Sequence, residues 1–287
     1  MGEHACRALL IIADPHSSES VARAWISAHC HLADKGDRQV CSEQITFQLC
    51  GETVDALPNI VFSHLDSDLP LYFWWRGEFR EPLDEKLWSW IDRLIYDSAI
   101  WSKPAAQFAL ARKIGDLTAD RTVLCDLNWT RLYGTRYALA QLFDHACALP
   151  RLKTIEHVSI TCAKRTTGLL LLGWLAAQLG WQYQNLLGKQ TFLTPSGSHV
   201  EFQIEEKAGA DISSCTFTCA DATFALTRKK NADYFEAHIT GTEVKETSLM
   251  IAGGKCGLAD ILLVELSRGG RHPLYAKALA EIELLLE

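Results

Sequence analysis

The sequence predicts an α/β fold with a mostly parallel sheet and helices on both faces, followed by a smaller antiparallel β region and C-terminal helices. Three observations predict it. Strand-like and helix-like segments alternate from residue 7 to about residue 180, the pattern of crossover units in a parallel sheet. Runs such as "RALLIIAD" at 7–14 are apolar without polar alternation, which strands covered on both faces do not need. After residue 188 the segments read as hairpins. We expect two domains, 1–120 and 121–287.

The first four elements follow from local patterns. "RALLIIAD" at 7–14 is dense in Leu and Ile and predicts a buried strand. At 17–33, a capping-type start and the helical spacing of Val21, Trp25 and His29 predict a helix. "SEQITFQLCG" at 42–51 alternates like a strand, and 53–68 is expected to be a helix with Pro58 near its start.

The next four elements repeat the alternation. "LPLYFWW" at 69–75 is expected to be a buried strand with Trp74 and Trp75 at its carboxyl end. A proline in the first turn with acidic residues behind it predicts a helix at 81–94. The ranges 94–99 and 103–117 are expected to be a short strand and a helix.

The second half continues the pattern and then changes it. We expect strands at 121–127 and 156–163, and helices at 133–149 and 166–180. Beyond residue 188, turn residues in "PSGS" and "KKNAD" separate hairpin strands. Two helices, near 257–268 and 273–286, are expected to end the chain.

Composition excludes some classes of function. The chain has 287 residues, 28 Lys and Arg against 35 Asp and Glu, and a net charge of −7. This acidic balance argues against nucleic-acid binding, which needs surplus positive charge. The longest apolar stretch, 168–181, is shorter than the ~20 residues of a spanning helix. We therefore expect a cytoplasmic protein that binds neither nucleic acid nor membrane.

The ten cysteines are expected to be reduced. Cys215 and Cys219, the closest pair in sequence, would be roughly 13 Å apart on a strand, too far for a disulfide. "HCH" at 29–31 could bind a metal, but at the end of a helix its histidines would more simply stabilise the helix dipole. Zinc-type cysteine pairs, nucleotide-binding glycine motifs and nucleophile elbows are missing from the sequence, so no catalytic residue, metal ligand or cofactor is predicted.

Two short stretches could bind a ligand or a partner. Between a strand and a helix, the cations and hydroxyls of Lys164, Arg165, Thr166, Thr167 and Gly168 could bind an anion; alternatively, a threonine caps the helix. The second stretch, 126–136, is rich in residues typical of protein interfaces. With the end of the 69–75 strand it would form a partner-binding face, whose expected members are Trp74, Trp75, Arg76, Trp129, Arg131, Tyr133 and Arg136. The alternative is that these tryptophans belong to the core.

Several motifs, in order along the chain, resemble the glucose-6-phosphate dehydrogenase assembly protein family, OpcA. They are "SEQITFQLCG", "DLPLYFWWRG", "DRLIYDS", "DLNWTRL", "GLLLLGWLAAQLGW" and "VELSRGGRHPLYAKAL". Two departures stand out. Family members usually carry more sequence before the first strand, and after "WTRL" they often have Trp-Arg where this chain has Thr135 and Arg136.

The resemblance implies a function that the motifs alone do not. It implies a non-catalytic allosteric activator that binds oligomeric glucose-6-phosphate dehydrogenase and supports NADPH production in the oxidative pentose phosphate pathway. It also implies thioredoxin as a second candidate partner. The alternative hypothesis is an enzyme or sensor that binds a sugar phosphate or nucleotide at 164–168.

Overall fold

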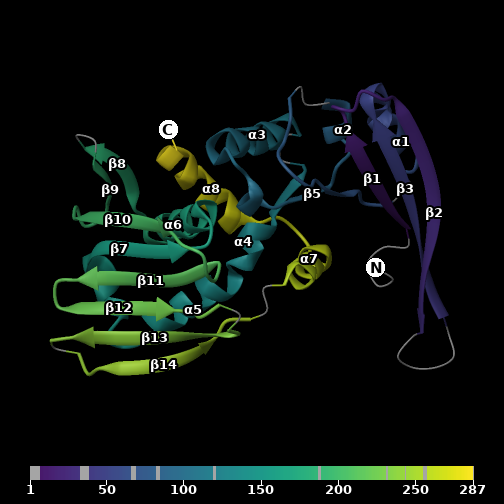
Figure 1. Ribbon diagram of the computed structural model, residues 1–287. Coiled ribbons are helices and arrows are strands. Elements are labelled where there is room, and N and C mark those ends of the chain that lie inside the picture. The colour runs from purple at the N-terminus through teal and green to yellow at the C-terminus, as the bar shows by residue number, and fades with distance from the viewer. Residues whose placement is uncertain are drawn as a thin grey trace. The chain divides into compact units, whose positions relative to one another are not determined.

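The computed structural model separates into two compact units (Figure 1). Residues 1–71 and 84–90 form the first unit, and residues 72–83 and 91–287 form the second. The predicted division at residue 120 remains a prediction. The described residues are 7–32, 39–65, 69–81, 85–118, 121–186, 189–230, 232–242, 244–254 and 257–286.

The first unit is built on a three-stranded sheet in the order β1-β3-β2. Strand β3 lies in the middle, parallel to β1 and antiparallel to β2. The elements of this unit are β1 (Arg7–Asp14), β2 (Val21–Leu32), β3 (Gln39–Cys50), the 3₁₀ helix η1 (Gly51–Ala56), α1 (Leu57–Ser63) and α2 (Glu85–Trp88). The predicted strands at 7–14 and 42–51 are confirmed. The predicted helix at 81–94 is much shorter, and the one at 53–68 is divided between η1 and α1.

The helix expected at 17–33 is wrong, because this segment is strand β2. It pairs with β3 along its whole length, from Val21 opposite Cys50 to Leu32 opposite Gln39. Twelve residues of ladder hydrogen bonds outweigh a helical spacing of three side chains, since tertiary pairing routinely overrides local propensity. The helix-dipole interpretation of His29 and His31 is wrong for the same reason.

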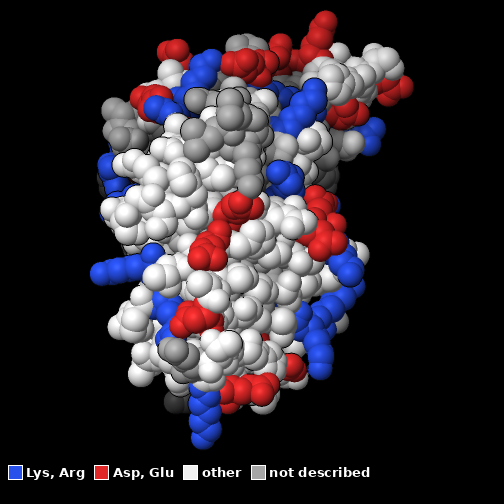
Figure 2. Space-filling view, turned by 90° about the vertical axis from the view of Figure 1, so that its left-hand side faces the viewer, with Lys and Arg blue, Asp and Glu red and all other residues white. Residues whose placement is uncertain are grey.

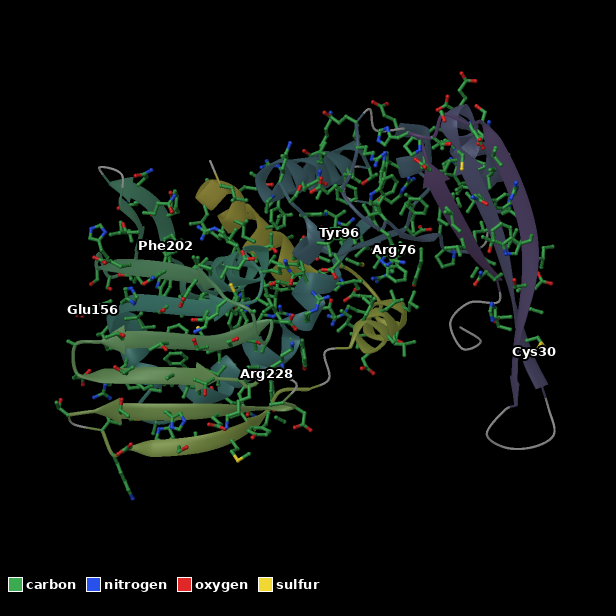
Figure 3. The ribbon with its side chains drawn as sticks, in the orientation of Figure 1. Cys30, Arg76, Tyr96, Glu156, Phe202 and Arg228 are labelled. Atoms are coloured by element: carbon green, nitrogen blue, oxygen red, sulfur yellow. A yellow bond between two sulfur atoms is a disulfide. The ribbon has the colours of Figure 1, made fainter. Side chains whose placement is uncertain are left out.

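Cys30 and Cys41 are directly opposite each other on β2 and β3 and form a disulfide, with Cα atoms 4.1 Å apart. Cys30 is labelled in Figure 3. The expectation that all cysteines are reduced is therefore wrong for this pair. Cys215 and Cys219 are free and buried on one strand, as predicted.

Hydrogen bonds and a glycine fix the short connection between β3 and η1. The backbone N–H of Cys50 donates to Thr53 Oγ1 over 3.0 Å, and the Thr53 hydroxyl donates to the Val21 carbonyl over 2.8 Å. Gly51 adopts a φ of +59°, and a Cβ there would lie 2.9 Å from the Glu19 carbonyl oxygen. Only glycine meets both requirements without strain. This junction fixes the start of the η1 and α1 segment on the sheet.

The second unit contains a small parallel sheet in the order β4-β5-β6. Its strands are β4 (Tyr72–Trp74), β5 (Arg93–Tyr96) and β6 (Val123–Asp126), and α3 spans Pro104–Leu117. The expected buried strand at 69–75 is wrong in length and burial, since Leu69 is 58% and Tyr72 36% exposed. Among the described strands, β4 has one neighbour and lies at the edge, whereas the central β5 is fully buried.

The larger sheet of this unit has eight strands in the order β14-β13-β12-β11-β7-β10-β9-β8. Only the β7–β10 pair is parallel; the other neighbours are antiparallel. The strands are β7 (Ile155–Cys162), β8 (Gln182–Leu186), β9 (Lys189–Leu193), β10 (His199–Glu206), β11 (Ile212–Cys219), β12 (Ala222–Thr227), β13 (Tyr234–Gly241) and β14 (Thr247–Ala252). The α/β class is confirmed, but the proportions are reversed, because the parallel sheet is the smaller one.

Helices lie over one face of the eight-stranded sheet (Figure 1). The helices of this unit, besides α3, are α4 (Leu127–Arg131), α5 (Tyr133–Phe143), α6 (Arg165–Leu179), α7 (Leu258–Ser267) and α8 (Pro273–Leu286), with short 3₁₀ segments η2 (Ser98–Ile100) and η3 (Leu149–Thr154). The helices predicted at 103–117, 133–149, 166–180, 257–268 and 273–286 are thus confirmed to within a few residues, apart from the earlier end of α5.

The core of the second unit lies between this sheet and its helices. Phe143 of α5 contacts Phe217 and Phe224 of the sheet, with ring centroids 5.0 and 5.4 Å apart. Helix α6 is buried on nearly every side, and burial of each leucine contributes about 1.5–3 kcal/mol. Gly173 lets α8 approach closely, because a Cβ there would lie 2.6 Å from the Ala278 carbonyl oxygen.

Charges of both signs are interspersed on the face shown in Figure 2. Among the described residues, none of the helices has the length and apolar character needed to cross a membrane.

Candidate functional site: the carboxyl edge of the parallel sheet

The carboxyl ends of β5 and β6 carry a buried polar network. Tyr96 ends β5, Asp126 ends β6, and the two residues are opposite each other in the sheet. Asp126 Oδ1 accepts hydrogen bonds from the backbone N–H groups of Ser98, over 3.0 Å, and Asn128, over 2.9 Å. The carboxylate thereby caps α4 and holds the loop after β5. Tyr96, labelled in Figure 3, is fully buried in this network.

Two tyrosines connect this network to helix α8. The hydroxyl oxygens of Tyr96 and Tyr275 are 2.7 Å apart, and Tyr275 donates to Asp126 Oδ2 over 3.5 Å. Burial, the main cause, raises the pKa of Asp126 to about 7, against the hydrogen bonds from Ser98 that lower it. Because burial outweighs these hydrogen bonds, the carboxyl holds its proton well above the ordinary aspartate range.

This pKa predicts how Asp126 affects stability. Between the ordinary pKa of 3.8 and about 7 the folded chain keeps a proton that the unfolded chain releases. The contribution of Asp126 to the free energy of unfolding is therefore fully present below pH 3.8 and is lost as pH rises through 7. The free energy of unfolding changes with a slope of at most about 1.4 kcal/mol per pH unit. We expect Asp126→Asn to remove this loss, so that the variant gains stability relative to the parent between pH 5 and pH 8. Urea unfolding at both pH values measures it; a pH-independent difference between the two chains would contradict the assignment.

A second group of charges lies beside the network. Arg131 donates from Nη2 to Asp97 Oδ2 over 2.8 Å, and its Nε is 3.9 Å from Asp211 Oδ2. Burial alone would lower the pKa of Arg131, but the hydrogen bond and charge of Asp97, together with Asp211, raise it above its usual value. Arg131 is thus engaged within the chain and holds the loop after β5 against α4.

Trp129 and Arg136 pack against each other. Trp129 is only 4% exposed, and the guanidinium carbon of Arg136 lies 3.6 Å from its ring centroid. Arg136 also donates from Nη1 to the Trp129 carbonyl over 2.8 Å. Burial, followed by the nearby charge of Arg268, lowers the pKa of Arg136 to about 9. The Trp129 ring also contacts Tyr275, so it belongs to the interior.

The residues of the predicted partner-binding face therefore differ in their exposure to solvent. Trp74, Arg76 and Tyr133 are exposed, and Arg76 lies over the Trp74 ring at 5.4 Å. Trp75, Arg131 and Arg136 are half-buried, and the Trp75 indole N–H donates to the Glu78 carbonyl over 3.0 Å. The residues after β4 and β6 share one edge of the sheet, but β5 separates the two strands, by roughly 10 Å in all.

The second predicted stretch lies at the start of α6. Lys164 and Arg165 are exposed, whereas Thr166, Thr167 and Gly168 are buried. The Arg165 backbone N–H donates to Glu206 Oε2 over 3.2 Å, and Thr167 donates to Asn128 Oδ1 over 2.8 Å. A carboxylate of the chain itself thus occupies one of the amides that an external anion would need.

Sequence reasoning missed the buried network around Asp126. One signal was present: both β5 and β6 end directly before or at an aspartate, in "YD" and "CD". In a parallel sheet such neighbours meet at one edge. The contribution of Tyr275 carries no such signal, because it comes from helix α8, about 150 residues further along the chain.

Comparison with known proteins assigns the chain to a family. Residues 122–279 match the family model for the C-terminal domain of the glucose-6-phosphate dehydrogenase subunit. Residues 1–113 match the model for the corresponding N-terminal domain. The chain belongs to the OpcA family of glucose-6-phosphate dehydrogenase assembly proteins.

OpcA proteins of cyanobacteria are similar along much of the chain. The OxPP cycle protein OpcA of Synechococcus elongatus is 26% identical, over 92% of this chain and 64% of the relative. The OpcA of Synechocystis is also 26% identical, over 61% of this chain and 37% of the relative. This chain thus spans less than two thirds of the length of either relative.

Solved structures show a more distant likeness. A levoglucosan dehydrogenase in complex with NADH and L-sorbose has a TM-score of 0.48 and 9% identity, over 84% of this chain and 80% of that one. An oxidoreductase from Bacillus cereus has a TM-score of 0.46 and 10% identity, over 83% and 81%. Similarity at this level gives no indication of activity for an OpcA family member.

Proposed function

We propose that the chain is a non-catalytic assembly factor and allosteric activator of glucose-6-phosphate dehydrogenase. The observation that supports this most is the match of both family domains, over residues 1–113 and 122–279. The names of the OpcA relatives refer to the OxPP cycle. The chain would bind the oligomeric dehydrogenase in the cytoplasm and support NADPH production in the oxidative pentose phosphate pathway.

The docking surface proposed for the dehydrogenase is the edge that carries Trp74, Arg76 and Tyr133. These side chains combine aromatic area with positive charge and are exposed, the combination that dominates the energetics of protein interfaces. Trp75, Trp129, Arg131 and Arg136 support this edge from within, through the contacts described above.

Thioredoxin remains a proposed second partner. The Cys30–Cys41 disulfide has both residues exposed and is a chemically suitable target for thiol–disulfide exchange.

Enzyme kinetics test the proposed function. With glucose 6-phosphate and NADP, we expect no NADPH from this protein alone and faster NADPH production when it is added to its cognate dehydrogenase. An activator works by binding the active conformation more tightly than the inactive one. If the effect is on substrate affinity, substrate must tighten the complex by the same factor. Initial rates over a range of substrate concentrations, together with titration calorimetry with and without substrate, measure both quantities.

Two outcomes would contradict the proposal. Unchanged dehydrogenase kinetics at saturating protein, with the complex confirmed by size-exclusion chromatography, would exclude activation. NADPH production by the isolated chain would exclude a non-catalytic role. A thermal-shift screen with sugar phosphates and nucleotides tests the alternative site at 164–168, with Lys164→Ala and Arg165→Ala as the variants that should abolish any shift.

A further inference from the structure

Three potential metal ligands meet inside the second unit. Cys125 lies on β6, Glu265 on α7 and His272 directly before α8. Their side chains are buried, and their ligand atoms all lie within 4.8 Å of one another. His272 Nε2 is 3.8 Å from Cys125 Sγ and 3.0 Å from Glu265 Oε2. One ring nitrogen thus faces both the sulfur and the carboxylate.

The two distances from His272 Nε2 lie near the edges of a tetrahedral zinc site. With Zn–S of about 2.3 Å and Zn–N and Zn–O of about 2.1 Å, tetrahedral ligands are separated by roughly 3.4 to 3.6 Å. The observed separations of 3.0 and 3.8 Å differ from that range by a few tenths of an ångström. We infer that Cys125, Glu265 and His272 form a binding site for a zinc-type divalent transition metal ion.

The surroundings of Glu265 orient one oxygen toward this site. Oε1 accepts a hydrogen bond from the Thr130 hydroxyl and is 3.8 Å from Arg268 Nε. Oε2 faces His272. Outer hydrogen bonds of this kind fix a ligand carboxylate for metal binding. Arg93 Nη1 is 3.4 Å from Cys125 Sγ and can donate to a metal-bound thiolate in the same way.

The backbone of His272 is fixed as well. Its carbonyl accepts from the Ala276 N–H over 3.0 Å, and Pro273 follows at the start of α8. Proline is favoured at this helix position because its φ is already helical. The imidazole is therefore presented from an ordered helix start.

The ligand set selects a class of ion. Thiolate and imidazole suit zinc and cobalt, whereas magnesium and calcium need oxygen ligands. A thiolate and a carboxylate would neutralise a divalent ion, and three protein ligands leave one tetrahedral position for water. The guanidinium groups of Arg93 and Arg268 oppose a cation here, so the ion must be held by its direct bonds to the ligands.

A nucleophilic triad is a poorer explanation of the same residues. In a triad the acid and the nucleophile bind different nitrogens of the histidine, whereas here both face Nε2. Cys125 is also 1% exposed, so a substrate could not reach its sulfur.

The ligands are 140 and 7 residues apart in sequence, which is why the chain shows no zinc-type spacing.

Cobalt(II) binding tests the inference. Burial raises the pKa of the Cys125 thiol to about 12, so without a bound ion it stays protonated at neutral pH. We expect one equivalent of Co²⁺ per chain to bind with a thiolate-to-cobalt absorption band and tetrahedral ligand-field bands. Cys125→Ser should abolish the thiolate band, and His272→Gln should weaken binding at least tenfold. Zinc should displace the cobalt and raise the melting temperature of the parent but not of Cys125→Ser.

Cys147→Ser is the matched control, because Cys147 Sγ lies 3.0 Å from His145 Nδ1 and offers a competing cysteine–histidine pair. This variant should keep the cobalt band and the affinity of the parent within twofold. Circular dichroism confirms that each variant is folded. The inference is overturned if the folded parent shows no thiolate band at saturating Co²⁺. It is equally overturned if the band disappears in Cys147→Ser and persists in Cys125→Ser.

Discussion

Replacing Trp129 by alanine is expected to lower the free energy of unfolding by about 3–5 kcal/mol. The indole is 4% exposed, and both Arg136 and Tyr275 contact it. The substitution removes this packing and leaves a cavity beside Arg136, whose guanidinium then loses its aromatic partner. Urea unfolding followed by circular dichroism measures the change.

Tyr133→Ala is the control for this expectation. Tyr133 is four residues along the same segment but 60% exposed, so its removal should cost at most about 0.5 kcal/mol. If the two variants lost equal stability, Trp129 would not be a core residue. The buried position assigned to it in the network would then be wrong.

The contrast between these two residues shows where sequence analysis succeeded. The motif "DLNWTRLYGTR" correctly places aromatic and cationic residues at the end of a strand. Which of them point inward depends on α4, α5 and α8 packing together. Tyr275, the residue that closes the space over Trp129, follows it by about 150 positions, and no local pattern could predict that contact.

In the fold as well, elements with local sequence signals were predictable and those that depend on distant contacts were not. Helices α3, α5, α6, α7 and α8 were predictable because their apolar spacing, prolines and terminal glycines are local signals. Strand β2 was not, because its identity comes from β3, to which it is hydrogen-bonded over twelve residues. The Cys30–Cys41 disulfide depends on the same register. A helix in place of β2 leaves these two cysteines without a common register, so their pairing could not be predicted.

The relative size of the two sheets differs from the prediction for a related reason. The segment 69–75 is apolar enough for a central strand, yet its described ladder with β5 covers Tyr72–Trp74 and lies at the edge of the sheet. An apolar run predicts that its side chains are removed from water. It does not show whether they are buried inside a sheet or lie on a surface that a partner protein could cover.

The second large expected effect is the loss of dehydrogenase binding when the exposed side chains of the docking edge are removed. At least one of Trp74→Ala, Arg76→Ala and Tyr133→Ala should weaken binding to the cognate dehydrogenase by about 2 kcal/mol or more, a roughly 30-fold rise in Kd. All three side chains are exposed, so their removal should leave the melting temperature nearly unchanged. Surface plasmon resonance on the folded variants gives the Kd, and differential scanning calorimetry gives the melting temperature.

Trp25→Ala provides a matched control for the docking edge. Trp25 is 44% exposed on β2, in the other compact unit, so it has comparable aromatic area outside this edge. It should bind the dehydrogenase within twofold of the parent. Arg131→Ala is unsuitable as a docking variant, because it would leave Asp97 without its 2.8 Å partner and disturb the fold. If Trp25→Ala weakened binding while the three edge variants bound normally, the dehydrogenase would dock on the β1-β3-β2 sheet, and the edge after β4 and β6 would have no role in the complex.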